Sequence, residues 1–120
     1  RNVTGVQTCA LPIWGGVLTT ASDLVFYGTL DRWFKAVDAQ SGKELWKFQV
    51  GSGVIGNAFT YGHKGKQYVG VLSGIGGWAG VAMNLGMTNP TDALGAAGGY
   101  AELTKYNAAP GGGALNVFSL

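Results

Sequence analysis

The feature that most constrains the fold is a turn with a tryptophan at a fixed distance beyond it, within residues 36–46 (Ala-Val-Asp-Ala-Gln-Ser-Gly-Lys-Glu-Leu-Trp). The side chains of Asp38 and Ser41 can hydrogen-bond the amides of the turn, and Gly42 can adopt the positive φ that closes it. Trp46 then falls on the returning strand, where its large ring can wedge against a neighbouring sheet. We interpret the element as a packing device with a buried tryptophan, not as a site of chemistry.

Short apolar stretches separated by turn residues occupy most of the chain up to residue 73. The turns include Ala21-Ser22-Asp23 and Gly62-His63-Lys64-Gly65. The predicted strands are residues 16–20, 24–29, 33–37, 44–50, 54–61, 66–73 and 114–119. The sequence therefore predicts an all-β fold built from a succession of short antiparallel strands.

Residues 74–110 differ in character, because they are rich in Gly, Ala, Asn and Pro and show little alternation. Within them, only residues 101–106 are predicted to form a helical turn. The segment is too long for an ordinary connector, and ordered loops of this length are usually functional. We therefore expect this loop to carry function.

The pattern Ala-x-Asp-x-x-x-Gly-Lys-x-x-Trp resembles the tryptophan-docking motif of the quinoprotein alcohol dehydrogenases, eight-bladed β-propellers that carry pyrroloquinoline quinone (PQQ). Further segments resemble the carboxy-terminal part of a methanol dehydrogenase large subunit, closer to its lanthanide-type than to its calcium-type branch: residues 14–20, 23–31, 63–69 and 76–80. Two positions depart from the family pattern. Ser41 replaces the usual Thr, and Arg32 replaces a usual turn glycine, which we expect to strain the turn or change its type.

The resemblance implies that residues 14–120 form the last blades of the propeller, with residues 74–110 as a loop on the cofactor side. It further implies that Gly77 and Trp78 lie beside PQQ, that Trp78 borders the substrate pocket, and that Trp14 is another cofactor-side tryptophan. From residue types alone, Trp78 is more simply a core side chain in a glycine-rich loop, and the resemblance reverses that order. The family's catalytic Asp and its ligands for Ca²⁺ or a lanthanide ion belong upstream, so we expect no catalytic or metal-binding residue in this chain.

For the intact parent protein, the resemblance implies a periplasmic homo-oligomer that oxidises methanol or another small primary alcohol and passes electrons to a cytochrome c. This chain by itself is then expected to be inactive. The alternative is a non-enzymatic propeller scaffold with the same docking repeats that binds proteins. The Gly76-Gly77-Trp78 loop favours the enzyme, since a scaffold has no need of it.

Residues 51–56 (Gly-Ser-Gly-Val-Ile-Gly) match a dinucleotide-binding fingerprint by their letters. That site also requires a helix whose amino terminus holds the pyrophosphate, whereas the following residues, 57–61, favour a strand. We therefore predict an inter-blade turn here. His63 is the only histidine, and it has no potential metal ligands at a suitable spacing. We therefore predict that it is an exposed turn residue and not a metal ligand.

A chain of 120 residues suffices for one modest domain, whereas a full propeller needs roughly 40–50 residues per blade. We therefore expect a fragment. The net charge of +2 and the lack of a basic, aromatic-rich cluster argue against a nucleic-acid partner, and no apolar stretch is long enough to predict a membrane span. Residues 1–13, which include Cys9, resemble a translated sequencing adapter, and we predict that they are a non-native tail.

Overall fold

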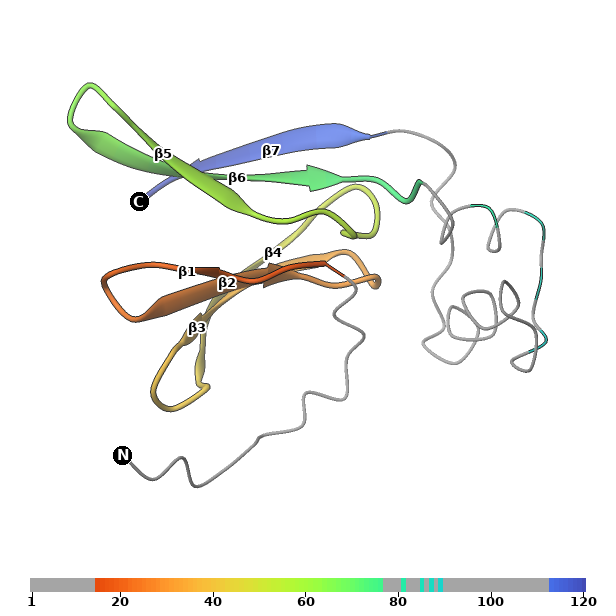
Figure 1. Ribbon diagram of the computed structural model, residues 1–120, viewed down its shortest axis with the longest axis horizontal. Helices are drawn as coiled ribbons and strands as arrows, with labels where there is room; N and C mark the ends of the chain where they lie inside the picture. Colours follow the sequence, from red (N-terminus) through yellow and green to blue (C-terminus); the bar gives the residue numbers. More distant parts are fainter. Residues whose placement is uncertain (1–14, 77–80, 82–84, 86, 88, 90–112) are drawn as a thin grey trace.

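A computed structural model describes residues 15–76, 81, 85, 87, 89 and 113–120, which contain two antiparallel sheets (Figure 1). The first sheet has the order β1-β2-β3-β4, formed by β1 (Leu18–Thr19), β2 (Leu24–Gly28), β3 (Trp33–Asp38) and β4 (Glu44–Gln49). The second has the order β5-β6-β7, formed by β5 (Phe59–His63), β6 (Lys66–Ser73) and β7 (Ala114–Ser119). The predicted all-β fold is confirmed, and in both sheets each strand pairs with its neighbour in the chain.

The turn between β3 and β4 has the hydrogen bonds that the sequence predicts. Oδ1 of Asp38 accepts hydrogen bonds from the amide and the hydroxyl of Ser41, both at 2.7 Å, and from the amide of Gln40 at 3.1 Å. The hydroxyl oxygen of Ser41 in turn accepts from the amide of Lys43 at 3.3 Å, and Gly42 has a φ of 71°. The turn therefore fixes where β4 begins, and with it the position of Trp46.

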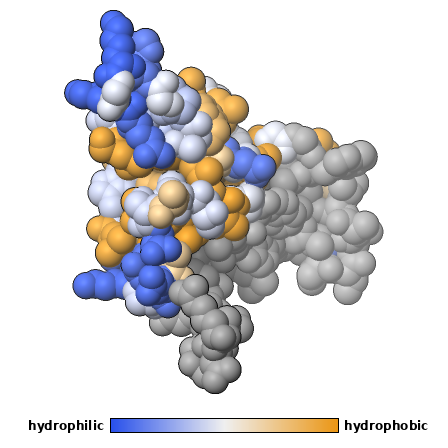
Figure 2. Space-filling model, turned by 60° about the vertical axis from the view of Figure 1, so that its left-hand side comes forward, coloured by the Kyte–Doolittle hydropathy of each residue, from blue (hydrophilic) through white to orange (hydrophobic). Residues whose placement is uncertain are grey.

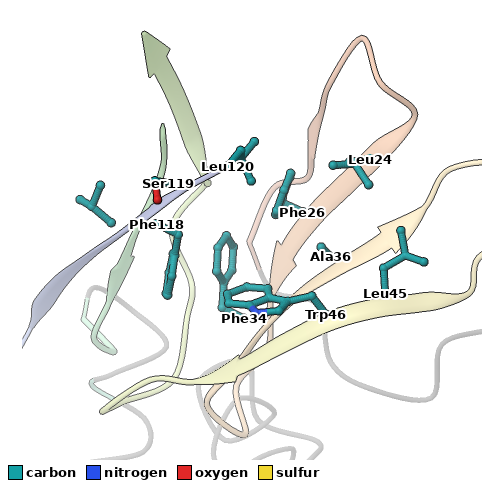
Figure 3. Close-up of a pocket in the computed structure, with 10 residues that line it drawn as sticks. Leu24, Phe26, Phe34, Ala36, Leu45, Trp46, Phe118, Ser119 and Leu120 are labelled. Carbon is teal, nitrogen blue, oxygen red and sulfur yellow. The ribbon is translucent and has the colours of Figure 1, made fainter. Parts of the chain in front are cut away.

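The core lies between the facing sides of the two sheets. Its fully buried members include Phe34 on β3 and Val69 and Val71 on β6. Phe118 on β7 stacks on Phe34 with the ring centroids 5.7 Å apart, and Trp46 on β4 meets Phe118 edge to face at 4.9 Å (Figure 3). The predicted wedge is confirmed, because Trp46 joins the first sheet to the second.

Trp46 is, however, 38% exposed, so the expectation of a buried tryptophan is wrong for this chain. Its ring borders an open cavity of about 540 Å³ between β4 and the end of β7 (Figure 3). The cavity is lined by Leu24, Phe26, Phe34, Ala36, Leu45, Trp46, Val117, Phe118, Ser119 and Leu120. The physical reason is that β4 is a fourth strand in the first sheet, whereas the described part of the second sheet has no strand beyond β7 to close the space.

The largest boundary difference concerns the start of β5, which was predicted at residue 54 and begins at Phe59. Val54 forms only a single parallel bridge, with Gly74, and its amide donates to the carbonyl oxygen of Thr29 at 3.0 Å. This segment therefore bonds to both sheets instead of joining one ladder. The following turn is also tighter than predicted, because Lys64 and Gly65, with φ of 48° and 76°, complete it alone.

The outer faces of the two sheets differ in chemistry. On the first sheet, Glu44 pairs with Lys35 (2.9 Å) and with Lys47 (3.1 Å), and Nζ of Lys47 lies 5.3 Å from the ring centroid of Trp33. The outer face of the second sheet is apolar and exposed: Phe59, Tyr61, Leu72, Leu115 and Val117. Figure 2 shows apolar residues in a band between hydrophilic groups on one side of the molecule.

The turn that joins β2 to β3 contains the departure noted in the sequence, because Arg32 has a φ of 71°. A side chain with a Cβ is disfavoured in this left-handed region, which glycine adopts freely. The expected strain at Arg32 is confirmed in this backbone angle.

Candidate functional site

The three residues predicted to contact a cofactor, Trp14, Gly77 and Trp78, lie outside the described residues, as do residues 1–13 and the predicted helical turn at 101–106. The structure does describe the chain immediately next to them, at Gly15–Gly16 and at Gly74–Gly76. The geometry of the site is therefore given by what holds these two flanking segments.

One segment holds both of them: residues 51–58, which connect β4 to β5. The amide of Gly16 donates to Oδ1 of Asn57 at 2.7 Å, and the amide of Gly74 donates to the carbonyl oxygen of Gly53 at 2.8 Å. Residues 51–58 contain no helix, which confirms the prediction of a connecting turn in place of a dinucleotide-binding site. We call this segment the connector.

The flanking segment before β1 lies flush against the connector. A Cβ added to Gly15 would lie 2.6 Å from the carbonyl oxygen of Gly56, and one added to Gly16 would collide with the side-chain amide of Asn57. A real Cβ does not approach other atoms this closely, so the contact requires glycine at both positions. Gly76 differs, because no described atom lies within 4 Å of an added Cβ there. Open space beside an exposed glycine fits the close approach of a flat ligand to the backbone.

The turn between β2 and β3 is hydrogen-bonded to the connector and to the residue before it. Thr29 is completely buried, and its carbonyl oxygen accepts from the amide of Val54. The amide of Val50 donates to the carbonyl oxygen of Arg32 at 2.9 Å. Oδ1 of Asp31, in the same turn, is buried without a hydrogen-bond partner among the described residues. The position of the connector is thus fixed by backbone hydrogen bonds to both sheets.

The ionised side chains with perturbed pKa values lie elsewhere. Hydrogen bonds from the side chain and then the backbone of Ser41 lower the pKa of Asp38, at the opposite end of β3 from the connector. Hydrogen bonds from Lys35 and then Lys47 lower the pKa of Glu44 on the outer face. Lys47, which is exposed, also lies close to the ring of Trp33.

Among the described residues, no group of three or more His, Cys, Asp and Glu side chains is arranged to hold a metal ion. His63, at the end of β5, is exposed as predicted. Within the same part of the chain, no helix is long and apolar enough to cross a membrane.

Asn57 is a functional candidate whose contact the sequence does not reveal. Its side-chain oxygen accepts a hydrogen bond from the amide of Gly16, just before β1. The bond joins residues 41 positions apart, so no local sequence signal predicts it.

The model of the PQQ family, described as the β-propeller domain of glucose, ethanol and alcohol dehydrogenases, matches residues 2–69. The chain belongs to this family. Its two sheets are therefore blades of a β-propeller, as the sequence predicted.

Two curated relatives and one solved structure are similar over most of this chain. It is 60% identical over 107 residues to the lanthanide-dependent methanol dehydrogenase of Methylorubrum extorquens, covering 89% of this chain and 18% of the relative. It is 51% identical over 108 residues to methanol dehydrogenase [cytochrome c] subunit 1 of Methylobacterium organophilum, covering 90% and 17%. A europium-containing methanol dehydrogenase superposes with a TM-score of 0.75 at 50% identity, covering 91% and 19%.

The chain thus spans about a fifth of the length of these relatives. The relatives confirm the resemblance to PQQ-dependent methanol dehydrogenases and its lanthanide-type branch. The assignment of residues 1–13 to a non-native tail stays a prediction, and the family match itself begins at residue 2.

Proposed function

We propose that this chain forms the carboxy-terminal blades of a PQQ-dependent methanol dehydrogenase, supplying one wall of the cofactor chamber and the blades that close the ring. The observation that carries the proposal is that the connector holds the segments leading to Trp14 and to Trp78 at the same end of the two sheets. Residues from separate strands must converge in this way to form a binding site.

The residues present fit PQQ as a flat ligand. Gly77 and Trp78 follow directly after Gly76, where the described structure leaves space beside the backbone. PQQ, when bound, accepts the electrons of the alcohol. In this proposal Trp78 supplies an aromatic wall that narrows the pocket for small alcohols and excludes water. The catalytic Asp and the ligands of the Ca²⁺ or lanthanide ion belong to sequence upstream of this chain.

The open edge of β7 supports the role in ring closure. Its one neighbour among the described strands is β6, and the cavity beside Trp46 and Phe118 lies where a fourth strand would cover it. Family propellers close by pairing the last strand with amino-terminal sequence, which removes such an edge. The exposed apolar face of the second sheet would then pack against the next blade.

The remaining parts of the proposal concern the whole enzyme. It is a periplasmic homo-oligomer that oxidises methanol or a similar primary alcohol and passes electrons to a cytochrome c, an acceptor that the name of the Methylobacterium relative contains. This chain alone has no activity, because the catalytic Asp and the metal ligands lie outside it.

A chimaera tests the proposal. Residues 14–120 replace the matching segment of the Methylorubrum enzyme, which is 60% identical, and alcohol oxidation is measured with a lanthanide and PQQ. The chimaera should oxidise methanol, and Trp78→Ala should lower PQQ content or admit larger alcohols. Unchanged kinetics and PQQ content in Trp78→Ala would contradict the assigned role of Trp78. A folded chimaera without PQQ would favour the scaffold alternative.

A further inference from the structure

The hydrogen bond between Asn57 and Gly16 lies where it can affect the cofactor without touching it. Gly16 is two residues after Trp14, and two residues of extended chain reach at most about 7 Å. Fixing the amide of Gly16 therefore confines where Trp14 can lie. Gly15, between them, is itself held against the carbonyl oxygen of Gly56.

The connector also holds Gly74, from which the chain leads to Trp78. Gly53 accepts the hydrogen bond from Gly74, and Val54 bridges Gly74 in parallel. Trp78 follows Gly74 by four residues, a reach of about 14 Å at most, so this constraint is looser. A single segment of chain, from Gly53 to Asn57, thus holds both Gly16 and Gly74, the described residues through which the chain leads to the two tryptophans.

We propose that Asn57 is a positioning residue for the cofactor: its side-chain oxygen fixes the Gly15–Gly16 backbone, which leads directly to Trp14. The inference rests on the proposed function, because it assumes that Trp14 contacts PQQ. Asn57 is exposed, and its Oδ1 accepts the hydrogen bond from the amide of Gly16.

A side chain suits this role better than a ladder hydrogen bond. Gly16 lies just before β1, and within the described part of the chain the β1 ladder involves Leu18 and Thr19 alone. The backbone ladder therefore does not reach Gly16. Without the oxygen of Asn57, the amide of Gly16 would bond to water and the two residues before β1 would gain freedom.

The test uses the chimaera of residues 14–120 in the Methylorubrum enzyme, prepared without cofactor and titrated with PQQ in the presence of a lanthanide. Asn57→Ala should weaken PQQ binding about fivefold, the factor for one lost hydrogen bond. Asn57→Asp should restore binding, because a carboxylate oxygen accepts the same amide proton. Thermal denaturation of each variant separates binding from folding.

Gln40→Ala is the matched control, because it also removes a side-chain amide, one that donates to Asp23 at 3.0 Å at the opposite end of the sheet. It should leave PQQ binding unchanged. If Asn57→Ala does not fold, Gly16→Ala replaces it, since its Cβ would displace the same amide.

Two outcomes overturn the inference. If Asn57→Ala lowers the denaturation midpoint but binds PQQ as the parent chimaera does, Asn57 is structural only. If Asn57→Asp binds PQQ as weakly as Asn57→Ala does, loss of the hydrogen-bond acceptor is not the cause of the weaker binding. Failure of the parent chimaera to bind PQQ would instead overturn the proposed function, and the positioning role with it.

Discussion

The first sheet, β1 to β4, and the second sheet, β5 to β7, share one apolar interface but differ in what covers their other sides. The first sheet has four strands and an outer face crossed by the ion pairs of Glu44 with Lys35 and Lys47. In the described residues, the second has three strands, an open edge at β7 and an outer face with exposed side chains such as Tyr61 and Leu115. The comparison teaches that, among the described residues, the first sheet has a fourth strand that covers its edge, whereas β7 of the second sheet has no such cover.

The largest expected effect concerns the shared interface. Phe34 is fully buried and contacts the rings of Phe26, Trp46 and Phe118. Phe34→Ala should lower the free energy of unfolding by about 3–5 kcal/mol, because it leaves a cavity between the sheets. Chemical denaturation of the chimaera measures this, with Lys43→Ala as an exposed control. A loss of under about 1 kcal/mol would show that the interface does not hold the sheets together.

A second prediction compares one glycine in each sheet. A Cβ on Gly28 of β2 would collide with the buried side chain of Val54, whereas one on Gly62 of β5 would meet only the carbonyl oxygen of Lys66 at 3.9 Å. Gly28→Ala should therefore cost about 1–3 kcal/mol, and Gly62→Ala should be neutral or slightly stabilising. Equal denaturation midpoints for the two variants would mean that the connector is not packed against β2.

The turns of the two sheets provide a third, smaller effect. Arg32→Gly should stabilise the protein by about 1 kcal/mol, because it relieves the left-handed backbone strain. Lys64→Gly, in the β5–β6 turn with a φ of 48°, should act in the same direction. Lys66→Gly is the control and should destabilise, since glycine weakens a strand. No gain in the denaturation midpoint of Arg32→Gly would indicate that the arginine makes a compensating contact.

The smallest effect is a pH dependence confined to the first sheet. The pKa values of Asp38 and Glu44 are lowered in the folded protein. The stability that these two carboxylates contribute is therefore fully present above their ordinary pKa values of 3.8 and 4.5. It is lost as the pH falls through the lowered pKa values, because protonation favours the unfolded state. Ser41→Ala should therefore reduce the midpoint at neutral pH and less so in acid. A difference that is constant with pH would exclude the Asp38 carboxylate as the cause.

Local chemistry made much of the fold predictable. The turn of Asp38, Ser41 and Gly42 determines its own conformation, and β6 and β7 were predicted at their observed bounds from β-prone, apolar residues. The sequence could not show that Val54 would leave the ladder, because its partners, Thr29 and Gly74, are distant in the chain.

The candidate site stays a prediction that rests on family resemblance. Trp14 and Trp78 carry no signal of their own, since a tryptophan in a glycine-rich loop is ordinarily a core residue. The bond between Asn57 and Gly16 could not be predicted, because the two residues are 41 positions apart in the chain. The exposure of Trp46 likewise depends on whether a strand lies beyond β7.

The central claim is that this chain forms part of the wall of a PQQ chamber, and a binding titration tests it most directly. The cofactor-free chimaera is titrated with PQQ and a lanthanide, and quenching of tryptophan fluorescence is followed. We expect saturable, equimolar binding that Trp78→Ala weakens. Absence of binding by a chimaera that is folded by circular dichroism, under conditions where the Methylorubrum enzyme itself binds PQQ, would contradict the claim.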